Sequence, residues 1–470
     1  MRHDHNGNVG AAIPDVAPTR LSESIILLRI ALPLIAAFLA ELAMFVTTKI
    51  VVGRQGYQEL AAVGLAGDLS FEVVVILMGF LSIVGVLVAR AEGADRKQDA
   101  GHAARQGLIV AAIVGVPATV LVWNLSSVMV LTGQDPTVVV LAEPYLHALS
   151  GFMLPVLWFA VLRSFVAALA RTGAVMVITV GAVGLNYLLT LGLVEGAFGL
   201  PALGIAGAGW ATHIVSWVMV VALVLYAYRI PHLRGYGLFR GRLRVDPSVC
   251  TEIARLGLPV AGLVALEAGL FIAVSILSGV LGVESLAAYE VIMGWVGIPF
   301  VVALGLAEAT MVRVALGLGR GSPAAARQAG LLGIGMGIGI LALMVVVPLG
   351  VPDLITLVFL EPEDPGFERI SALTAQLLVI AAVFQVFDGL QAIASRALRG
   401  MRDTVVPLLF AGFGYWVLGI GGGSLLTFPL GLGAAGLWWG LALGLIVTGS
   451  LLAWRFVRLS GRHLHAPEDG

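Results

Sequence analysis

Acidic side chains inside long apolar segments are the residues of this sequence best suited to chemistry. Glu41, Glu267 and Asp388 each lie well inside a stretch that is long enough, at about 20 apolar residues, to cross a bilayer as a helix. A carboxylate at such a depth is costly and rare, and it usually has a function. It can carry a proton or supply hard oxygen ligands to a small cation. These residues therefore indicate an ion-binding site within a membrane.

Two of these carboxylates belong to an internal repeat. Residues 29–62 align without a gap with residues 255–288, and Glu41 matches Glu267 at a separation of 226 positions. Other identical pairs in this alignment are Arg29 and Arg255, Leu32 and Leu258, Pro33 and Pro259, Phe45 and Phe271, and Gly53 and Gly279. A chain that repeats a membrane carboxylate together with its helix is typical of transporters built from two related lobes.

Glu267 and Asp388 form the predicted cation- or proton-binding pair. Both fall in the second half of the chain, so helix packing can bring them together around one ion. In a second repeat register, with an offset of 228 positions, Asp388 aligns with Ala160, which cannot ionise. Glu41 therefore has no acidic partner in its own lobe. We interpret it either as a coupling or substrate-contact residue, or as a structural carboxylate paired with Lys49.

The remaining acidic candidates are secondary. Asp68 and Glu72 lie four residues apart and share a helix face, which favours either the entrance of a cavity or a solvated surface near the headgroups. Glu290 and Glu308 follow Glu267 in the next predicted helix. Tyr289 belongs to a set of aromatic residues that suit organic cations through cation–π contacts, although ordinary packing explains most such residues equally well.

Three arginines are predicted to serve the membrane boundary rather than the site. Arg163, Arg313 and Arg396 lie near the cytoplasmic ends of their predicted helices, from which a long side chain can reach the headgroups. Two histidines, His147 and His213, are interpreted as core residues. An intramembrane enzyme would need a nucleophile with a base or a set of metal ligands, and two isolated histidines in different helices do not supply either.

The composition sets the fold class. Hydrophobic residues make up 59% of the chain, charged residues 12%, and the mean hydropathy is +1.01. These values predict an all-α polytopic membrane protein with twelve transmembrane helices in two six-helix lobes, related by a pseudo-twofold axis along the membrane normal. The predicted spans are 28–52, 60–90, 105–130, 144–168, 174–194, 203–229, 253–279, 286–316, 327–349, 371–397, 404–426 and 431–456.

Charges at the helix ends indicate the orientation. Arginine and lysine gather in every second connection, which predicts that both termini are cytoplasmic. The expected organisation is a polar N-terminal tail at 1–24, an N-lobe at 25–229, a basic cytoplasmic linker at 230–252, a C-lobe at 253–458 and a C-terminal tail at 459–470. The tail at 1–24 lacks the apolar core of a secretory signal.

Several classes of function are not supported. Cys250 is the only cysteine, so neither a disulfide framework nor a thiolate metal site is expected. Phosphate-binding and dinucleotide-binding motifs are missing, which predicts no bound cofactor, no structural metal and no use of ATP. The net charge of −1 gives no indication of a nucleic-acid partner. The predicted partners are the lipid bilayer and small molecules, with no obligatory protein partner.

The chain resembles the multidrug and toxic compound extrusion (MATE) family, and its NorM-like branch most closely. The resemblance rests on these segments: LPLIAAFLAELAMFVTTKIVVGRQG, LAAVGLAG, LRSFVAALART, GLPALGIAGAGWAT, GLPVAGLVALEAGLFIAVSIL and FQVFDGLQAIASRALRGMRDT. It implies a bacterial inner-membrane antiporter that expels organic cations such as drugs and dyes against entry of Na⁺ or H⁺. Glu267 and Asp388 occupy positions where this branch has its cation-binding carboxylates.

One departure concerns the first lobe. Many relatives carry an aspartate where this chain has Thr47, so the carboxylate of that lobe is missing, while Asn186 remains of its polar site. Glu41 lies about one to two turns earlier on the same helix, and we hypothesise that it substitutes for the lost group. An alternative within the superfamily is a flippase or exporter of lipid-linked cargo. The acidic character of the deep charges favours cationic cargo. Whether Na⁺ or H⁺ is the coupling ion stays open.

Overall fold

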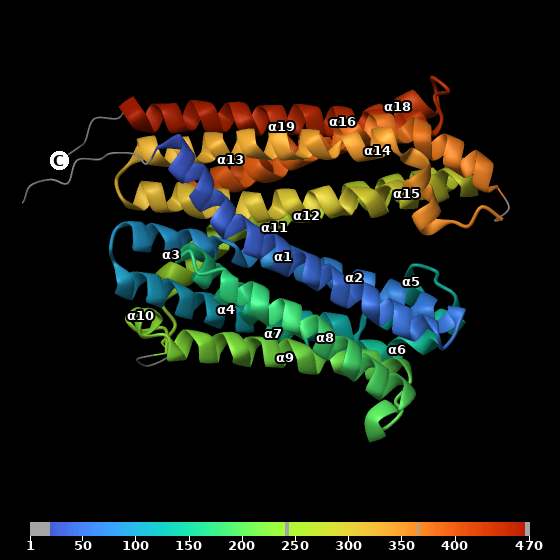
Figure 1. Ribbon diagram of the computed structural model, residues 1–470, viewed down its shortest axis with the longest axis horizontal. Coiled ribbons are helices and arrows are strands. Elements are labelled where there is room, and N and C mark those ends of the chain that lie inside the picture. Colours follow the sequence, from blue (N-terminus) through green and yellow to red (C-terminus); the bar gives the residue numbers. More distant parts are fainter. Residues whose placement is uncertain (1–18, 240–243, 364–365, 466–470) are drawn as a thin grey trace, which may run out of the picture.

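Long helices make up the described part of this protein, residues 19–239, 244–363 and 366–465 of a computed structural model (Figure 1). The first half contains α1 (Arg20–Gly53), α2 (Tyr57–Leu81), α3 (Ile83–Gly93), α4 (Lys97–Trp123), α5 (Leu125–Leu131), α6 (Pro136–Ser150), α7 (Met153–Ala168), α8 (Gly173–Glu195), the short η1 (Ala197–Gly199), α9 (Ile205–Arg229) and α10 (Pro231–Arg234). The second half contains α11 (Pro247–Leu281), α12 (Val283–Gly319), α13 (Pro323–Met344), α14 (Val346–Gly350), α15 (Pro352–Phe359), α16 (Phe367–Gly400), α17 (Val405–Ala411), η2 (Gly412–Gly422), α18 (Gly423–Thr427) and α19 (Ala434–His465).

The predicted membrane class is confirmed. Within the described residues, eleven helices are long and apolar enough to cross a membrane, and α6 with α7, bent by 47°, makes a twelfth span if the pair counts as one. Many of these helices expose large apolar side chains to their surroundings, as Val177, Ile276 and Leu343 do. Apolar residues on an outward face are what a helix in contact with lipid requires.

Helix ends differ from the predicted spans in an instructive way. α1 begins at Arg20, capped by the hydroxyl of Thr19, which accepts a hydrogen bond from the backbone of Ser22. α19 continues to His465. The helices are therefore longer than the apolar runs that reveal them, because polar turns continue the helix past the hydrocarbon. The expected tail at 1–24 lies outside the described residues as far as position 18.

Most helix contacts fall within one half, but several helices contact both halves, α1 and α11 among them. The early part of α1 packs against α12, and its later part packs against α8. Leu27, Ile30 and Leu34 of α1 share a buried cluster with residues of α12, α13 and α16. In the same manner, Ile253 and Val260 of α11 join the buried cluster of the first half. The early part of α1 thus packs in the second half, and the early part of α11 packs in the first half. We call this arrangement the exchange of helix ends.

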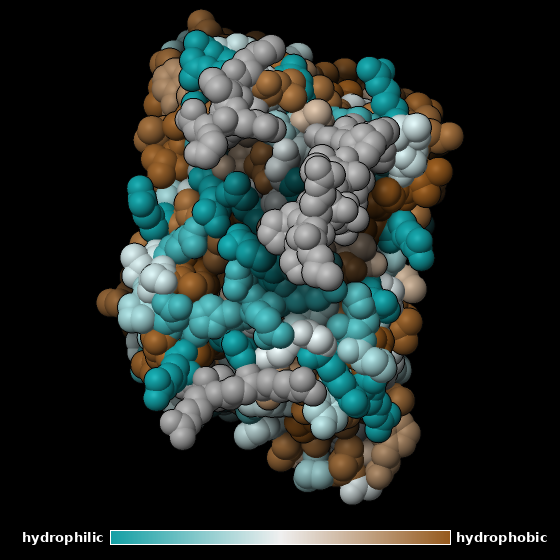
Figure 2. Space-filling model, turned by 90° about the vertical axis from the view of Figure 1, so that its left-hand side faces the viewer, coloured by the Kyte–Doolittle hydropathy of each residue, from teal (hydrophilic) through white to brown (hydrophobic). Residues whose placement is uncertain are grey.

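The halves meet closely at the end of the molecule that carries α3 and α10 (Figure 1). A Cβ atom on Gly319 would lie 2.1 Å from the carbonyl oxygen of Arg90, and one on Gly93 would lie 2.3 Å from that of Leu316. The backbones of α3 and α12 are therefore in direct contact. Figure 2 shows this end face-on, with hydrophilic residues gathered across it and hydrophobic residues along the sides.

The connection between the halves is docked rather than loose. We call residues 230–239 and 244–246 the linker strap. Tyr236 is fully buried, stacks edge-on against Phe165, and donates a hydrogen bond to Glu92 at 2.8 Å. Arg105 and Gln106 of α4 donate to backbone carbonyls of the strap at 3.0 and 2.8 Å. These contacts fix the start of α11 to the first half.

Candidate functional site

A cluster of buried polar groups lies between α11, α16 and η2. Glu267 of α11 and Asp388 of α16 are close enough for their carboxylates to interact electrostatically. Gln391, one turn after Asp388, donates to the hydroxyl of Tyr415 from η2, and its amide lies close enough to Glu267 to stabilise that carboxylate. Asp388, Gln391 and Tyr415 are each at most 2% exposed. The structure thus brings together the two carboxylates that the sequence singled out.

Two oxygen atoms of this cluster have no hydrogen-bond partner. Asp388 Oδ1 and Gln391 Oε1 are buried, and neither finds a donor among the described residues. Buried acceptors are normally satisfied, so orphaned oxygens beside a second carboxylate call for an explanation. A proton or a Na⁺ ion would satisfy them, because both are recognised by oxygen atoms. These oxygen atoms therefore fit a small cation as ligands.

The backbone of η2 positions Tyr415. This segment of eleven residues is a π-helix, a rare form that occurs often at functional sites. Its glycines let it approach α19 closely: a Cβ on Gly414 would lie 1.9 Å from Thr448 Oγ1, and one on Gly444 would lie 2.6 Å from the Gly414 carbonyl. The glycines therefore allow the aromatic ring to fill the space beside the carboxylates.

Basic residues follow the carboxylates along α16. Arg396 lies 3.8 Å from Glu308, and Arg399 donates to the hydroxyl of Ser82 at 2.8 Å. Ser82 is the break between α2 and α3, so Arg399 contacts the other half of the molecule. The prediction that Arg396 extends to the headgroups is wrong, because its guanidinium turns inward to Glu308. Glu308 is consequently part of an ion pair.

Glu41 has a basic partner in its own half. Arg163 of α7 donates to Glu41 at 2.7 Å, and its guanidinium lies 4.8 Å from the centre of the Phe38 ring and 3.9 Å from the sulfur of Met78. The predicted pairing of Glu41 with Lys49 is therefore wrong, as is the expectation that Arg163 serves the headgroups.

Lys49 instead pairs with Asp68 at 3.0 Å, where both side chains are accessible. Immediately before Lys49 on α1, Thr47 donates to the carbonyl of Met44 at 3.0 Å, and Thr48 donates to Asn186 of α8 at 3.1 Å. The Thr48–Asn186 contact is buried. The hydroxyl–amide contact thus lies next to Thr47, the position at which the family resemblance leads one to expect a carboxylate, and Thr47 itself bonds only to its own helix.

The other secondary candidates do not join the cluster. Tyr289 is 4% exposed and donates to the carbonyl of Phe271 at 3.0 Å, as part of a packed aromatic group with Trp438. Glu290 is exposed and accepts from Ser275 at 3.5 Å. Its charge faces Asp68 and Lys49 across the two halves.

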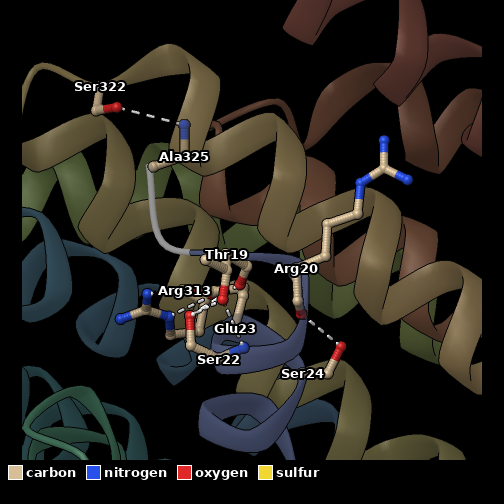
Figure 3. Close-up of polar contacts among 8 residues, drawn as sticks. All are labelled: Thr19, Arg20, Ser22, Glu23, Ser24, Arg313, Ser322 and Ala325. Carbon is tan, nitrogen blue, oxygen red and sulfur yellow. Dashed lines mark hydrogen bonds and ion pairs between the residues drawn. The ribbon is translucent and has the colours of Figure 1, made fainter. Parts of the chain in front are cut away.

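A buried ion pair escaped the sequence analysis. Glu23 of α1 receives two hydrogen bonds from Arg313 of α12, at 2.7 and 2.6 Å, and Figure 3 shows the two side chains facing each other below Thr19. Glu23 is 1% exposed. The prediction that Arg313 extends to the headgroups is therefore wrong. Its guanidinium instead links α1 to the second half. Glu23 gave no signal because it lies outside the apolar run of its helix.

The geometry includes no conventional metal centre. Among the described residues, no group of three or more His, Cys, Asp or Glu side chains could hold a metal ion.

Comparison with known proteins decides the family. The MatE family model matches residues 33–191 and 259–424, two segments that begin 226 positions apart. The chain belongs to the MatE family. A probable multidrug resistance protein NorM of Pseudomonas putida is 40% identical, with 95% of this chain and 97% of that protein covered. The multidrug resistance protein NorM of Burkholderia vietnamiensis is 36% identical, with 99% and 100% covered.

Solved MatE structures share the fold. A MATE transporter in a bent conformation superposes with a TM-score of 0.84 at 18% identity, covering 96% of this chain and 99% of that one. An outward-facing MATE family transporter gives a TM-score of 0.84 at 19% identity, covering 94% and 97%. The predicted family, the all-helical fold and the class of efflux transporter rather than enzyme are confirmed by this membership.

Proposed function

We propose that this MatE protein exports organic cations by antiport with Na⁺ or H⁺ and that Glu267 and Asp388 bind the coupling ion. The observation that carries the proposal is the buried carboxylate of Asp388, which has an unpartnered oxygen beside a second carboxylate. A group of this kind inside a membrane needs either a proton or a cation. The names of the NorM relatives support drugs as cargo.

Alternating access between the two halves is the proposed mechanism. Inter-half contacts concentrate at the end with the linker strap, where Glu23 meets Arg313 and Arg399 meets Ser82. At the other end of the helices, Lys49 and Asp68 are accessible and Glu290 is exposed. This arrangement supports a state open on the side of Glu290 and closed on the side of the strap.

We further propose that the strap and both termini are cytoplasmic and that the protein lies in the bacterial cytoplasmic membrane. The basic residues of the strap end support this orientation.

Coupling follows from competition. When the carboxylates of Glu267 and Asp388 are ionised, they favour the cationic cargo, and binding of the ion favours its release. By thermodynamic linkage, the ion must weaken cargo affinity by the same factor by which the cargo weakens ion affinity. Glu41, Asn186 and Asp68 remain candidate substrate contacts in the first half. Lipid-linked anionic cargo is less well supported, because Arg163 and Arg396 are already neutralised by glutamates.

Transport into liposomes tests the proposal. Purified protein is reconstituted, and movement of ethidium is followed under an imposed Na⁺ gradient at fixed pH, or under a pH gradient without Na⁺. We expect one gradient to drive transport, and Asp388→Asn and Glu267→Gln to abolish that drive. Glu284→Gln is the matched control, because that carboxylate forms an exposed pair with Arg369. Full ion-driven transport by Asp388→Asn would contradict the proposal.

A further inference from the structure

The two halves place a carboxylate at corresponding positions but surround it differently. Glu41 and Glu267 correspond at an offset of 226. In α7 and α16 the offset is 228, at which Phe159 and Phe387 are identical, as are Leu162 and Leu390. This register aligns Arg163 with Gln391 and Ala160 with Asp388.

The contacts agree with this alignment. In the second half, the amide of Gln391 lies close enough to Glu267 to stabilise its carboxylate, and in the first half, Arg163 donates to Glu41 at 2.7 Å. The same position on the same helix therefore meets the repeated glutamate in both halves. The charges differ, because the second half carries two carboxylates, whereas the first half carries one carboxylate and one guanidinium.

The surroundings of the Arg163 guanidinium are those expected for a bound organic cation. Phe38 offers an aromatic face at 4.8 Å, Met78 a polarisable sulfur at 3.9 Å and Glu41 a charged oxygen at 2.7 Å. Aromatic faces and carboxylates attract cations, and the Met78 sulfur accepts a hydrogen bond from the guanidinium. Only 12% of the Arg163 side chain is exposed, so the guanidinium is enclosed rather than solvated.

We propose that the first half contains a cation site that the Arg163 guanidinium fills permanently, as a tethered cation, and that this residue confines ion binding to the second half. The inference rests on the function proposed above, since it assumes that the second half binds the ion. Arg163 thus sets how many ions the protein binds. A merely structural ion pair would not have this consequence.

Exchanging the partners between the halves tests the inference. Ala160→Asp combined with Arg163→Gln gives the first half the side chains of the second. Binding of radioactive sodium and uptake of protons are measured on purified protein. We expect the exchanged protein to bind an additional equivalent of whichever ion the wild type binds. In an Asp388→Asn background, the exchange should restore ion binding that Asp388→Asn alone has lost. Arg163→Lys, which keeps the charge, should bind the wild-type amount.

A second variant tests the inference independently, so that the test does not depend on folding of the exchanged protein. Gln391→Arg places a guanidinium beside Glu267, where it should fill the second site and strongly reduce ion binding. Gln391→Met separates the two effects, because it removes the amide oxygen without adding charge. It should reduce ion binding less than Gln391→Arg does.

Unchanged ion binding in a well-folded exchanged protein, or wild-type ion affinity in Gln391→Arg, would overturn the inference and leave the proposed function standing. Failure of the wild type itself to bind either ion would instead overturn the proposed function, and the inference with it.

Discussion

At the scale of single residues, intramembrane charges in this protein are mostly neutralised by a specific partner. Glu41 meets Arg163, Glu308 meets Arg396, and Glu23 meets Arg313. Asp388 is different, since the charge that acts on it is another carboxylate, Glu267, and one of its oxygens has no donor. This contrast separates a group that keeps helices in place from a group that is available for an ion.

The Glu41–Arg163 pair gives a prediction for stability. Glu41→Gln or Arg163→Gln alone leaves a charge without its partner. Because the Glu41 side chain is 27% exposed and that of Arg163 12%, each change should lower the free energy of unfolding by about 1–3 kcal/mol. The double variant should lose much less, because no charge remains unpaired. Thermal unfolding of the three purified variants measures this difference. Equal losses in the single and double variants would contradict the pairing.

The sequence identified some of these residues and not others, for physical reasons. Glu267 and Asp388 were recognisable because a carboxylate deep in an apolar run is unusual in itself. The partner of Glu41 was not, since Arg163 lies 122 positions away and is near the end of its own apolar run. Tyr415 was one of many aromatic residues, and the sequence did not indicate that it lies in a π-helix and bonds to Gln391.

At the scale of elements, the linker strap is the feature that a sequence pattern could not reveal. The segment 230–252 was predicted as a basic linker from its charges, glycines and prolines. Its docking depends on a close approach to α4, where a Cβ on Gly101 would lie 1.7 Å from the carbonyl oxygen of Tyr236. A glycine inside a helix looks unremarkable in the sequence, although here no other residue fits.

Gly101→Ala should therefore displace the strap. Overpacking of this kind costs about 1–3 kcal/mol, and contact with a backbone atom leaves little freedom to relax. The matched control is Gly184→Ala in α8, where an added Cβ meets no atom within 4 Å, so the substitution should be neutral or stabilising. Hydrogen exchange across residues 230–239 reports on the strap directly. Unchanged protection in Gly101→Ala would contradict the close contact.

The strap should also loosen in acid. Hydrogen bonds from Ser248 and from the ring of His102 lower the pKa of Asp246 to about 2, from an ordinary value of 3.8. Since the folded pKa is the lower one, this contribution to stability is complete above the ordinary value and is lost as the pH falls toward 2. Asp246→Asn should abolish this part of the pH dependence, as measured by thermal unfolding across that range. The same acid sensitivity in wild type and variant would contradict the assignment.

At the scale of the whole molecule, the two halves are joined at one end by polar contacts. Glu23 of the first half bonds to Arg313 of the second, and Arg399 of the second half bonds to Ser82 of the first. Opening this end requires breaking both. The equilibrium between open and closed states should therefore depend on them.

Glu23→Gln should shift the molecule toward opening at the strap end. Removing one partner of a buried ion pair destabilises the state that contains the pair by about 3–5 kcal/mol. Changing a two-state ratio from about 1:99 to about 99:1 takes roughly 5.5 kcal/mol. Loss of this pair should therefore shift the populations of the two states measurably. Distances between spin labels on the ends of α3 and α12 measure the shift. Glu284→Gln should leave them unchanged, because its exposed pair contributes little. An unchanged distance distribution in Glu23→Gln would show that this pair does not hold the end closed.

The exchange of helix ends also has a consequence for biosynthesis. α1 leaves the ribosome before the other described helices, yet Leu27, Ile30 and Leu34 pack against helices that are made much later. Glu23 likewise lacks its partner until Arg313, which follows it by 290 positions, has been synthesised. The early part of α1 therefore enters the membrane without these contacts and gains them only after α12 and α13 have been inserted.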